Sequence, residues 1–359
     1  MASSLADSHG RAALLHNGLM IPAAPLALTA EGAFSPRHQR ALMRYYAAAG
    51  CGGVAVGVHT TQFAIRDEKV GLLRPVLEVC AQELAACEAR HGRPILRVAG
   101  VCGLTPQAVE EARLAASLGY DAVLLSLGAW HSAEEPDMLE HCRTIAAILP
   151  LIGFYLQPAV GGRVLSAAFW REFAGIDNVV AIKIAPFNRY QTIDVVRGVA
   201  LAGAQDRVTL YTGNDDNIIA DMLTPFPVHV PGTGPVEMRI RGGLLGQFSV
   251  HARTFVRLME TIRELCQGDV VPAELLRRNV ELTEANAVLF DAANGFRGCI
   301  PGINEVLRRR GLLPSNRCLD PTEVLSPGQA EELTRVEQDY PWLSDAPFIR
   351  EHLQEWLDE

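Results

Sequence analysis

The sequence has few lysines and no long apolar run. Of its 32 lysine and arginine residues only two are lysines, Lys69 and Lys183. No apolar stretch approaches the roughly 20 residues that a membrane-spanning helix requires. The N-terminal residues lack the basic start and apolar stretch of a signal peptide. These absences predict a soluble, cytoplasmic protein that has no membrane partner.

Motifs for several other classes of protein are also missing. A net charge of −9 without a basic cluster argues against nucleic-acid binding. The eight cysteines form no CxxC pair, as expected for reduced, buried thiols. The ten histidines form no HxH, HxxH or HExxH pair, and neither GxSxG nor a P-loop occurs. We therefore expect no metal and no cofactor.

Short apolar, β-branched runs recur along the chain, and each is followed by a segment with helical periodicity. Continuous apolar runs are typical of parallel strands that are buried on both faces. The third to seventh runs begin 27 to 30 residues apart, which suits a repeated strand–loop–helix–loop unit. The predicted strands cover residues 19–24, 52–58, 94–100, 121–127, 151–156, 178–184 and 207–213.

An eighth strand completes the pattern. Residues 226–232 and 245–252 both qualify, and we favour 245–252 because the preceding RGGLLG suggests a turn. The predicted fold class is α/β, a (β/α)8 TIM barrel with a helical C-terminal extension. A doubly wound sheet is the competing architecture, but no GxGxxG turn follows the first strand.

The predicted organisation is an N-terminal extension (1–15), a TIM barrel (16–267) and a C-terminal helical region (268–359). The segment 226–243 is long for a connection between strand and helix. It is interpreted as a lid or an interface arm.

Lys183 stands in the apolar run NVVAIKI (178–184), in a chain that uses arginine almost everywhere else. An arginine stays protonated, whereas a desolvated lysine can lose its proton and attack a carbonyl group. A lysine that reaches solvent or pairs with a carboxylate is the structural alternative. In βα barrels the working residues lie at the C-terminal ends of strands, and Lys183 is near the end of the sixth.

Other polar residues stand at corresponding strand ends. Tyr155 ends the fifth strand, and Thr60 and Thr61 follow the second. A buried lysine that faces a phenol, with hydroxyl groups nearby, is a plausible Schiff-base site. Each residue also has an ordinary structural interpretation, as a core aromatic or as a turn threonine.

These residues resemble the dihydrodipicolinate synthase/N-acetylneuraminate lyase family of class I aldolases. Tyr155-Leu156-Gln157-Pro158 matches the family's Tyr-x-x-Pro motif, and Lys183 follows Tyr155 by 28 residues, like the family's Schiff-base lysine. His59-Thr60-Thr61 is similar to its Gly-Thr-Thr loop, and Gly213-Asn214-Asp215 to its Gly-Asp-Asp turn. The resemblance covers residues 16–312.

The resemblance implies a role for each matched residue. Lys183 forms an imine with a 2-oxo acid such as pyruvate, Tyr155 is the acid/base, and Thr60 is a possible proton relay. Thr61 holds the substrate carboxylate. The other expected substrate-binding residues are His59, Trp130, Gly213 and Asn214. The family usually forms tetramers, so a homo-oligomer, dimer or tetramer, is expected.

Departures from the family pattern bear on the substrate. Val160 occupies the position of the arginine that binds the second substrate in dihydrodipicolinate synthases, and Arg163 lies three residues later. Gly128-Ala129-Trp130 replaces the family's Pro-Tyr-Tyr, and Gln62-Phe63 replaces Gly-Glu. We therefore predict a lyase or aldolase that acts through a lysine Schiff base on a less polar 2-oxo acid of the pyruvate type, with a substrate other than aspartate semialdehyde.

Several alternatives remain open. The protein could be a hydratase-aldolase or a dehydratase of the same family, or a catalytically silent relative that binds a 2-oxo acid. Lys183 could be only an ion-pair partner, for instance of Asp215. Asn214-Asp215-Asp216 is interpreted as a cap of the next helix. His59 could contact substrate or serve structurally.

Overall fold

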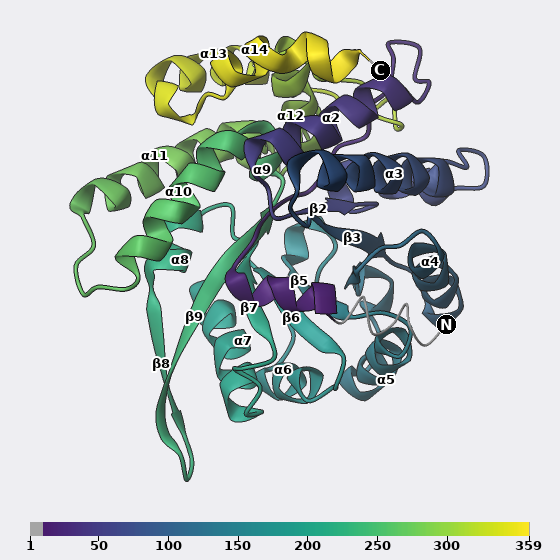
Figure 1. Cartoon of the computed structure of the whole chain (residues 1–359). Coiled ribbons are helices and arrows are strands. Elements are labelled where there is room, and N and C mark those ends of the chain that lie inside the picture. The colour runs from purple at the N-terminus through teal and green to yellow at the C-terminus, as the bar shows by residue number, and fades with distance from the viewer. Residues whose placement is uncertain (1–9, 359) are drawn as a thin grey trace. The chain divides into compact units, whose positions relative to one another are not determined.

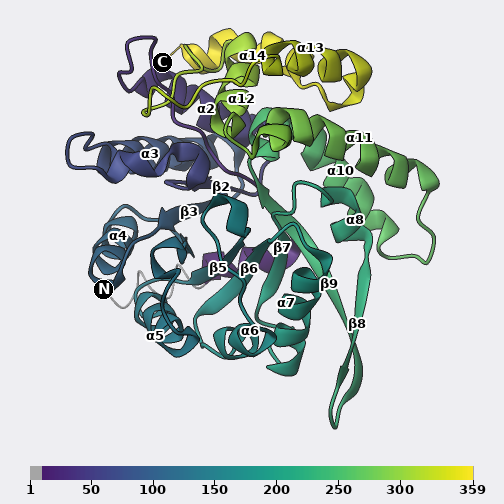
Figure 2. The ribbon, with the colours of Figure 1, turned by 180° about the vertical axis from the view of Figure 1, so that it is seen from behind.

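The computed structural model describes residues 10–358. The chain divides into two compact units, one built from residues 10–19 and 98–244 and the other from 20–97 and 245–358 (Figures 1 and 2). Residues 1–9, most of the predicted N-terminal extension, lie outside the described residues. Each unit is described by itself.

The first unit is a parallel sheet covered by helices. Its strands are neighbours in the order β9, β7, β6, β5, β4, β3. Their bounds are β3 (Leu96–Val101), β4 (Ala122–Leu125), β5 (Leu151–Leu156), β6 (Val179–Ala185), β7 (Thr209–Thr212) and β9 (Gly234–Leu245). The helices that follow β3 to β7 are α4 (Thr105–Ser117), α5 (Glu135–Ala146), α6 (Ala167–Ala174), α7 (Arg189–Leu201) and α8 (Ile218–Leu223). Helices α4 to α7 cover the outer face of the sheet (Figure 1).

The second unit contains two strands, four helices before residue 268 and the helices of the C-terminal region. Strands β1 (Met20–Pro22) and β2 (Gly53–Val56) continue into a parallel bridge between Ala23 and Ala55. The helices are α2 (Pro36–Ala49), α3 (Leu73–His91), α9 (Gln247–Val250), α10 (Ala252–Leu265), α11 (Ala273–Leu289), α12 (Cys299–Arg309), α13 (Gln329–Asp339) and α14 (Ala346–Leu357).

The last helix is anchored on α2. Trp356 of α14 is buried, and its ring centroid lies 5.6 Å from that of Tyr45. Arg44 of α2 donates to the Trp356 carbonyl at 2.8 Å and pairs with the buried Glu83 of α3 at 2.7 Å. The predicted helical C-terminal region is therefore present, and its final helix packs on the helices of its own unit.

The predicted eighth strand is wrong. Residues 247–250 form helix α9, and the strand beside β7 is β9, within the segment that the sequence suggested was a loop. The two glycines before Leu244 are part of that strand and do not form a turn. A Cβ atom on Gly242 would lie 2.5 Å from the Leu19 carbonyl oxygen and 2.7 Å from the Tyr211 ring. Close packing of the backbone thus explains the glycine.

The remainder of segment 226–243 forms an antiparallel hairpin. Strand β8 (Pro225–Val230) pairs with the first half of β9, with Val228 opposite Val236. The hairpin extends away from the other strands of its unit (Figures 1 and 2). Its role as a lid or an interface arm stays a prediction.

Candidate active site

Lys183 lies near the C-terminal end of β6, with its side chain half-buried. Pairing with β5 places it opposite Phe154, so the two side chains share one face of the sheet. The lysine Nζ lies 4.4 Å from the centroid of the Phe154 ring. Such a contact stabilises an ammonium group by about 0.5–2 kcal/mol. The sequence analysis did not identify Phe154.

Tyr155 does not form the predicted pair with Lys183. It is opposite Ile184, and its ring packs on Trp170 of α6 at a centroid distance of 5.0 Å. Its hydroxyl oxygen accepts from the Leu165 N–H at 3.2 Å and donates to the Leu165 carbonyl at 3.5 Å. Because successive residues of a strand point to opposite faces, Phe154 faces the lysine and Tyr155 faces the helices.

The electrostatic surroundings of Tyr155 agree with this placement. Burial raises the pKa of its phenol, the Leu165 hydrogen bond lowers it, and the charges of Asp194 and Glu135 raise it further. Both carboxylates belong to helices of the outer layer, α7 and α5. The phenol of Tyr155 therefore lies near side chains of the helix layer.

Gly213 follows β7 and leaves space for the lysine chain. Its N–H donates to the Ile184 carbonyl at 2.7 Å, which keeps the backbone close to β6. A Cβ atom here would lie 2.6 Å from Lys183 Cε, 3.0 Å from Lys183 Cγ and 2.9 Å from the Ala185 Cβ. The predicted site residue Gly213 thus contacts the lysine, and a side chain at this position would displace it.

The carboxyl group of Asp215 is within reach of the lysine's charge. Burial raises the pKa of its carboxyl to about 7, the charge of Lys183 lowers it, and the charge of Asp216 raises it. The Oδ1 atom of Asp215 is shielded from solvent.

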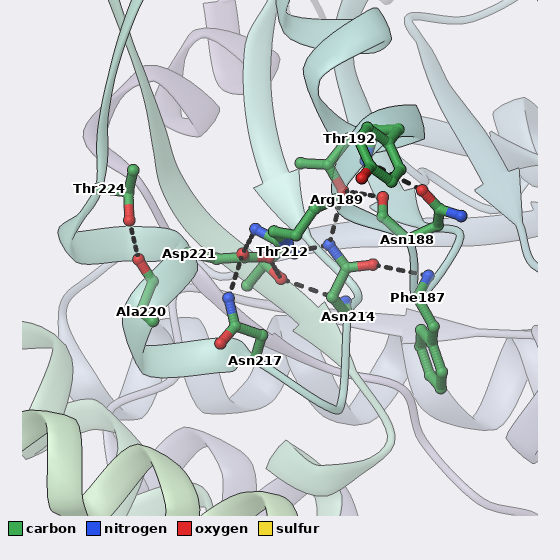
Figure 3. Close-up of polar contacts among 11 residues, drawn as sticks. Phe187, Asn188, Arg189, Thr192, Thr212, Asn214, Asn217, Ala220, Asp221 and Thr224 are labelled. Carbon is green, nitrogen blue, oxygen red and sulfur yellow. Dashed lines mark hydrogen bonds and ion pairs between the residues drawn. The ribbon is translucent and has the colours of Figure 1, made fainter.

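Asn214 is fully buried and joins the loops that follow β6 and β7 (Figure 3). Its Oδ1 accepts from the Phe187 N–H at 3.0 Å, and its Nδ2 donates to Thr192 at 3.3 Å and to Asp221 at 2.9 Å. Phe187 has a φ of 53°, a left-handed conformation that is rare for an aromatic residue. The asparagine amide therefore fixes a strained loop beside the end of β6.

The buried carboxylate of Asp221 is the centre of this network. It accepts hydrogen bonds from Thr212 at 2.7 Å and from Asn217 at 3.1 Å, in addition to Asn214, and it forms an ion pair with Arg189 (Figure 3). Helix α8 has Asn217 as its N-cap residue, without a capping hydrogen bond. The predicted capping role of residues 214–216 is therefore wrong, because Asn214 bridges two loops.

Trp130 lies in the short helix that follows β4. Its ring is 4.7 Å from that of the buried His141, and its Nε1 donates to the Gly103 carbonyl at 3.3 Å. Arg163 donates to the carbonyl groups of Trp130, His131 and Ala133. The guanidinium near the Tyr-x-x-Pro motif thus holds the backbone of this loop.

Thr60, Thr61 and His59 belong to the second unit. Thr61 Oγ1 donates to the Ala24 carbonyl at 2.7 Å and accepts from the Gly57 N–H at 2.9 Å. Thr60 Oγ1 donates to the Ala23 carbonyl at 2.8 Å. Both hydroxyls thus bond to the backbone of their own unit. The His59 ring lies 6.1 Å from that of Phe63.

Within residues 10–358, no group of three or more histidine, cysteine or carboxylate side chains is arranged to hold a metal ion. In the same part of the chain, no helix is long and apolar enough to span a membrane.

Comparison with known proteins agrees with the geometry of the fold. The family model described as "Dihydrodipicolinate synthetase family" matches residues 22–227, more than half of the chain. The 4-hydroxy-tetrahydrodipicolinate synthase of Synechocystis sp. is 27% identical over 66% of this chain and 69% of that protein. The one from Moorella thermoacetica is 26% identical over 82% of this chain and 89% of that protein.

Solved structures of the same fold include a synthase, a pyruvate complex and a lyase. Dihydrodipicolinate synthase from Aquifex aeolicus superposes with a TM-score of 0.70 at 18% identity, covering 91% of this chain and 99% of that one. YagE from E. coli K12, in complex with pyruvate, superposes with a TM-score of 0.71 at 18% identity. This match covers 90% of this chain and 98% of that one. N-acetylneuraminate lyase from Fusobacterium nucleatum superposes with a TM-score of 0.67 at 14% identity, covering 90% of this chain and 99% of that one.

These likenesses confirm the predicted TIM-barrel fold, and the low identities fit a divergent sequence. The chain belongs to the dihydrodipicolinate synthetase family, and it is an enzyme of the aldolase/lyase class.

Proposed function

We propose that this enzyme uses Lys183 to form an imine with a 2-oxo acid, and that it makes or breaks a carbon–carbon bond next to that imine. The observation that carries the proposal is the lysine itself. It is one of two in the chain, it is half-buried near the C-terminal end of a barrel strand, and Lys69 is exposed. Active residues of βα barrels lie at these strand ends.

The surroundings of Lys183 suit an amine that changes its charge. The ammonium form is favoured by the Phe154 ring and by the Asp215 carboxylate, whereas partial burial opposes it. The imine nitrogen is positive when protonated, so the same two groups stabilise the iminium ion. Gly213 has no side chain and therefore leaves the space that the lysine chain occupies.

The 2-oxo acid in this proposal is of the pyruvate type. A relative of the same fold has been solved in complex with pyruvate. By resemblance, Thr61 would hold the carboxylate, Thr60 would be a relay, and His59 and Trp130 would contact the partner substrate. The two threonine hydroxyls already bond to backbone carbonyls.

Aspartate semialdehyde is not the proposed partner substrate. Val160 stands where dihydrodipicolinate synthases carry an arginine for its carboxylate. The neighbouring Arg163 bonds to the carbonyl groups of the loop at Trp130. Because the Arg163 guanidinium is engaged by these carbonyl groups, we favour a partner substrate that is less polar than aspartate semialdehyde. Within the family, hydratase-aldolase and dehydratase reactions use the same imine and remain the alternative reaction types.

Reductive trapping tests the imine. The protein is incubated with pyruvate and sodium borohydride, and its intact mass is compared with that of Lys183→Arg. One reduced adduct, absent in the variant, is expected. Turnover of aspartate semialdehyde with pyruvate is measured in parallel, and robust synthase activity would refute the proposed substrate class.

The coupling with Asp215 also supports a second candidate, in which Lys183 is only an ion-pair partner. In that case neither pyruvate nor larger 2-oxo acids would be trapped, and Lys183→Ala would destabilise the fold by leaving a buried carboxylate without its partner.

A further inference from the structure

A cleft among the C-terminal helices contains buried polar groups that the proposed imine chemistry does not use. Gln247 begins α9, is 0% exposed and lines this cleft, whose volume is about 40 Å³. The cleft belongs to the second unit, in which α12 packs on α9 and α13, and α13 packs on α11. Much of its wall is apolar and is formed by Ala285, Leu289, Val306, Leu333, Val336 and Leu343.

The terminal amide of Gln247 is unusual for a buried glutamine. Neither its Oε1 nor its Nε2 has a hydrogen-bond partner in the described part of the chain, and burial without partners destabilises a fold. Gln329, a buried glutamine of the same unit, shows the ordinary arrangement. Its Oε1 accepts from the Ser326 N–H at 3.1 Å, and its Nε2 donates to the carbonyl groups of Val288 and Gly298, both at 3.1 Å. Gln247 therefore has one acceptor and one donor group to offer.

His251 lines the same cleft and adds a second donor. Its Nε2 lies 3.2 Å from Nη2 of Arg310. A guanidinium group can only donate, so Nε2 accepts and the ring proton is on Nδ1. Burial and the charge of Arg310 lower the pKa of His251 well below its ordinary value, which keeps the ring neutral. Within residues 10–358, the shielded Nδ1 has no hydrogen-bond partner, so its N–H is available to a ligand.

The two arginines that line the cleft are already engaged by other groups. Arg310 donates to the Val250 carbonyl and forms an ion pair with Glu337 at 3.6 Å. Arg309 forms an ion pair with the buried Glu305 at 2.9 Å. Because these positive charges are balanced by carboxylates, the cleft suits a neutral head group better than an anion.

We propose that this cleft binds a small neutral molecule that has a carboxamide head group and an apolar body. The carbonyl oxygen of a carboxamide has two lone pairs, which accept from Gln247 Nε2 and His251 Nδ1, and its N–H donates to Gln247 Oε1. A volume of about 40 Å³ holds about three water-sized groups, and a carboxamide has that number of non-hydrogen atoms. The apolar body then lies on Leu333 and Val336.

Benzamide, acetophenone and benzoate are three probes of nearly the same shape that test the head group. Acetophenone keeps the carbonyl group but has no N–H donor, and benzoate has no donor and carries a negative charge. The affinity of each probe for the full chain is measured by saturation-transfer NMR titration. Benzamide should bind at least about 10-fold more tightly than either, because a buried acceptor left without a donor costs that much. Equal affinity for acetophenone, or no binding of benzamide, would overturn the proposal.

Gln247→Met shows whether benzamide binds in this cleft, because methionine has a similar length and removes both polar atoms of the amide. It should weaken benzamide binding by at least about 10-fold and leave the affinity for acetophenone almost unchanged. Benzamide affinity that is retained in this variant would mean that the probe binds elsewhere, against the proposal. Ala285→Leu, which fills the cleft, should abolish benzamide binding and gives the same test if Gln247→Met does not fold.

Gln329→Met is the matched control, since it removes a buried amide that has its hydrogen-bond partners within the protein. It should lower the midpoint of urea denaturation and leave the benzamide affinity close to that of the unaltered protein. Gln247→Met should keep the midpoint or raise it, because the replaced amide lacks partners within the protein. A midpoint that falls as far in Gln247→Met as in Gln329→Met would show that the Gln247 amide is satisfied without a ligand, and would contradict the proposal.

Discussion

Replacing Gly213 by alanine is expected to disable Lys183 with only a moderate effect on stability. The new methyl group would lie 2.6 Å from Lys183 Cε, 3.0 Å from its Cγ and 2.9 Å from the Ala185 Cβ, where ordinary contacts are 3.4–4 Å. Relief of the shortest contact requires a shift of about 1 Å in the lysine chain, because the Gly213 N–H is bonded to Ile184. Overpacking of this kind costs about 1–3 kcal/mol.

A displacement of about 1 Å in a reacting group can lower a rate by about 100-fold. We therefore expect Gly213→Ala to slow pyruvate trapping by that factor, measured as the rate of appearance of the borohydride-reduced adduct. Urea denaturation of the same preparation gives the change in the free energy of unfolding. The loss in the free energy of unfolding should be about 1–3 kcal/mol.

Gly153→Ala is the matched control. Its Cβ would lie 2.6 Å from Phe173 Cε1, an equally severe contact but on the helix side of β5. It should cost a similar amount of stability and leave the trapping rate close to that of the unaltered protein. Trapping by Gly213→Ala at the unaltered rate, or equal slowing in both variants, would refute the placement of Gly213 against the lysine.

Three further predictions concern stability. Burial lowers the pKa of His141 to about 4 from 6.5, so the unfolded chain binds a proton that the folded chain excludes, and stability falls as the pH drops from 6.5 to 4. His141→Gln should flatten that fall by roughly 3 kcal/mol, measured by denaturation at each pH, and an unchanged slope would contradict it. Asn214→Ala should cost about 1–3 kcal/mol and slow trapping, because Phe187 N–H loses its acceptor. Asn188→Ala, which removes the N-cap of α7, should cost about 1 kcal/mol, and its trapping rate provides the comparison for Asn214. Trp356→Ala should cost about 3–5 kcal/mol in chemical denaturation, and a negligible loss would show that α14 is dispensable.

The barrel strands could be predicted where both faces are buried. Residues 179–184 are uniformly apolar apart from the lysine, and β6 spans Val179–Ala185. The eighth strand could not be predicted in this way because it begins in an exposed hairpin and carries three glycines. Gly242 reflects close packing against Leu19 and Tyr211, residues distant in the sequence. Local turn chemistry therefore misidentified the position of this strand.

The candidate site shows a different limit. Spacing along the chain located Lys183 and Tyr155 at adjacent strand ends, but a strand changes face with every residue. Phe154, one residue earlier, is therefore the aromatic on the lysine's face. Alternation along Gly153, Phe154 and Tyr155 is the signal that could have shown this. Gly153 packs against Phe173 of the helix layer, and Tyr155, two residues later, packs against Trp170 of the same layer.

The Asn214-Asp215-Asp216 turn looked like a helix cap because asparagine and aspartate are common there. Its actual role depends on burial and on Asp221, seven residues beyond Asn214, which the local pattern does not reveal. The sequence did suggest Asp215 as a partner of Lys183, and the electrostatic coupling between them agrees with that pairing.

The most direct test of the account is to locate the trapped adduct within the chain. After incubation with pyruvate and borohydride, peptide mapping by mass spectrometry separates the two lysines, the exposed Lys69 and the half-buried Lys183. The account predicts one adduct, on Lys183, which forms equally in Lys69→Arg. An adduct on Lys69 or the terminal amine alone, or no adduct with any 2-oxo acid, would contradict it.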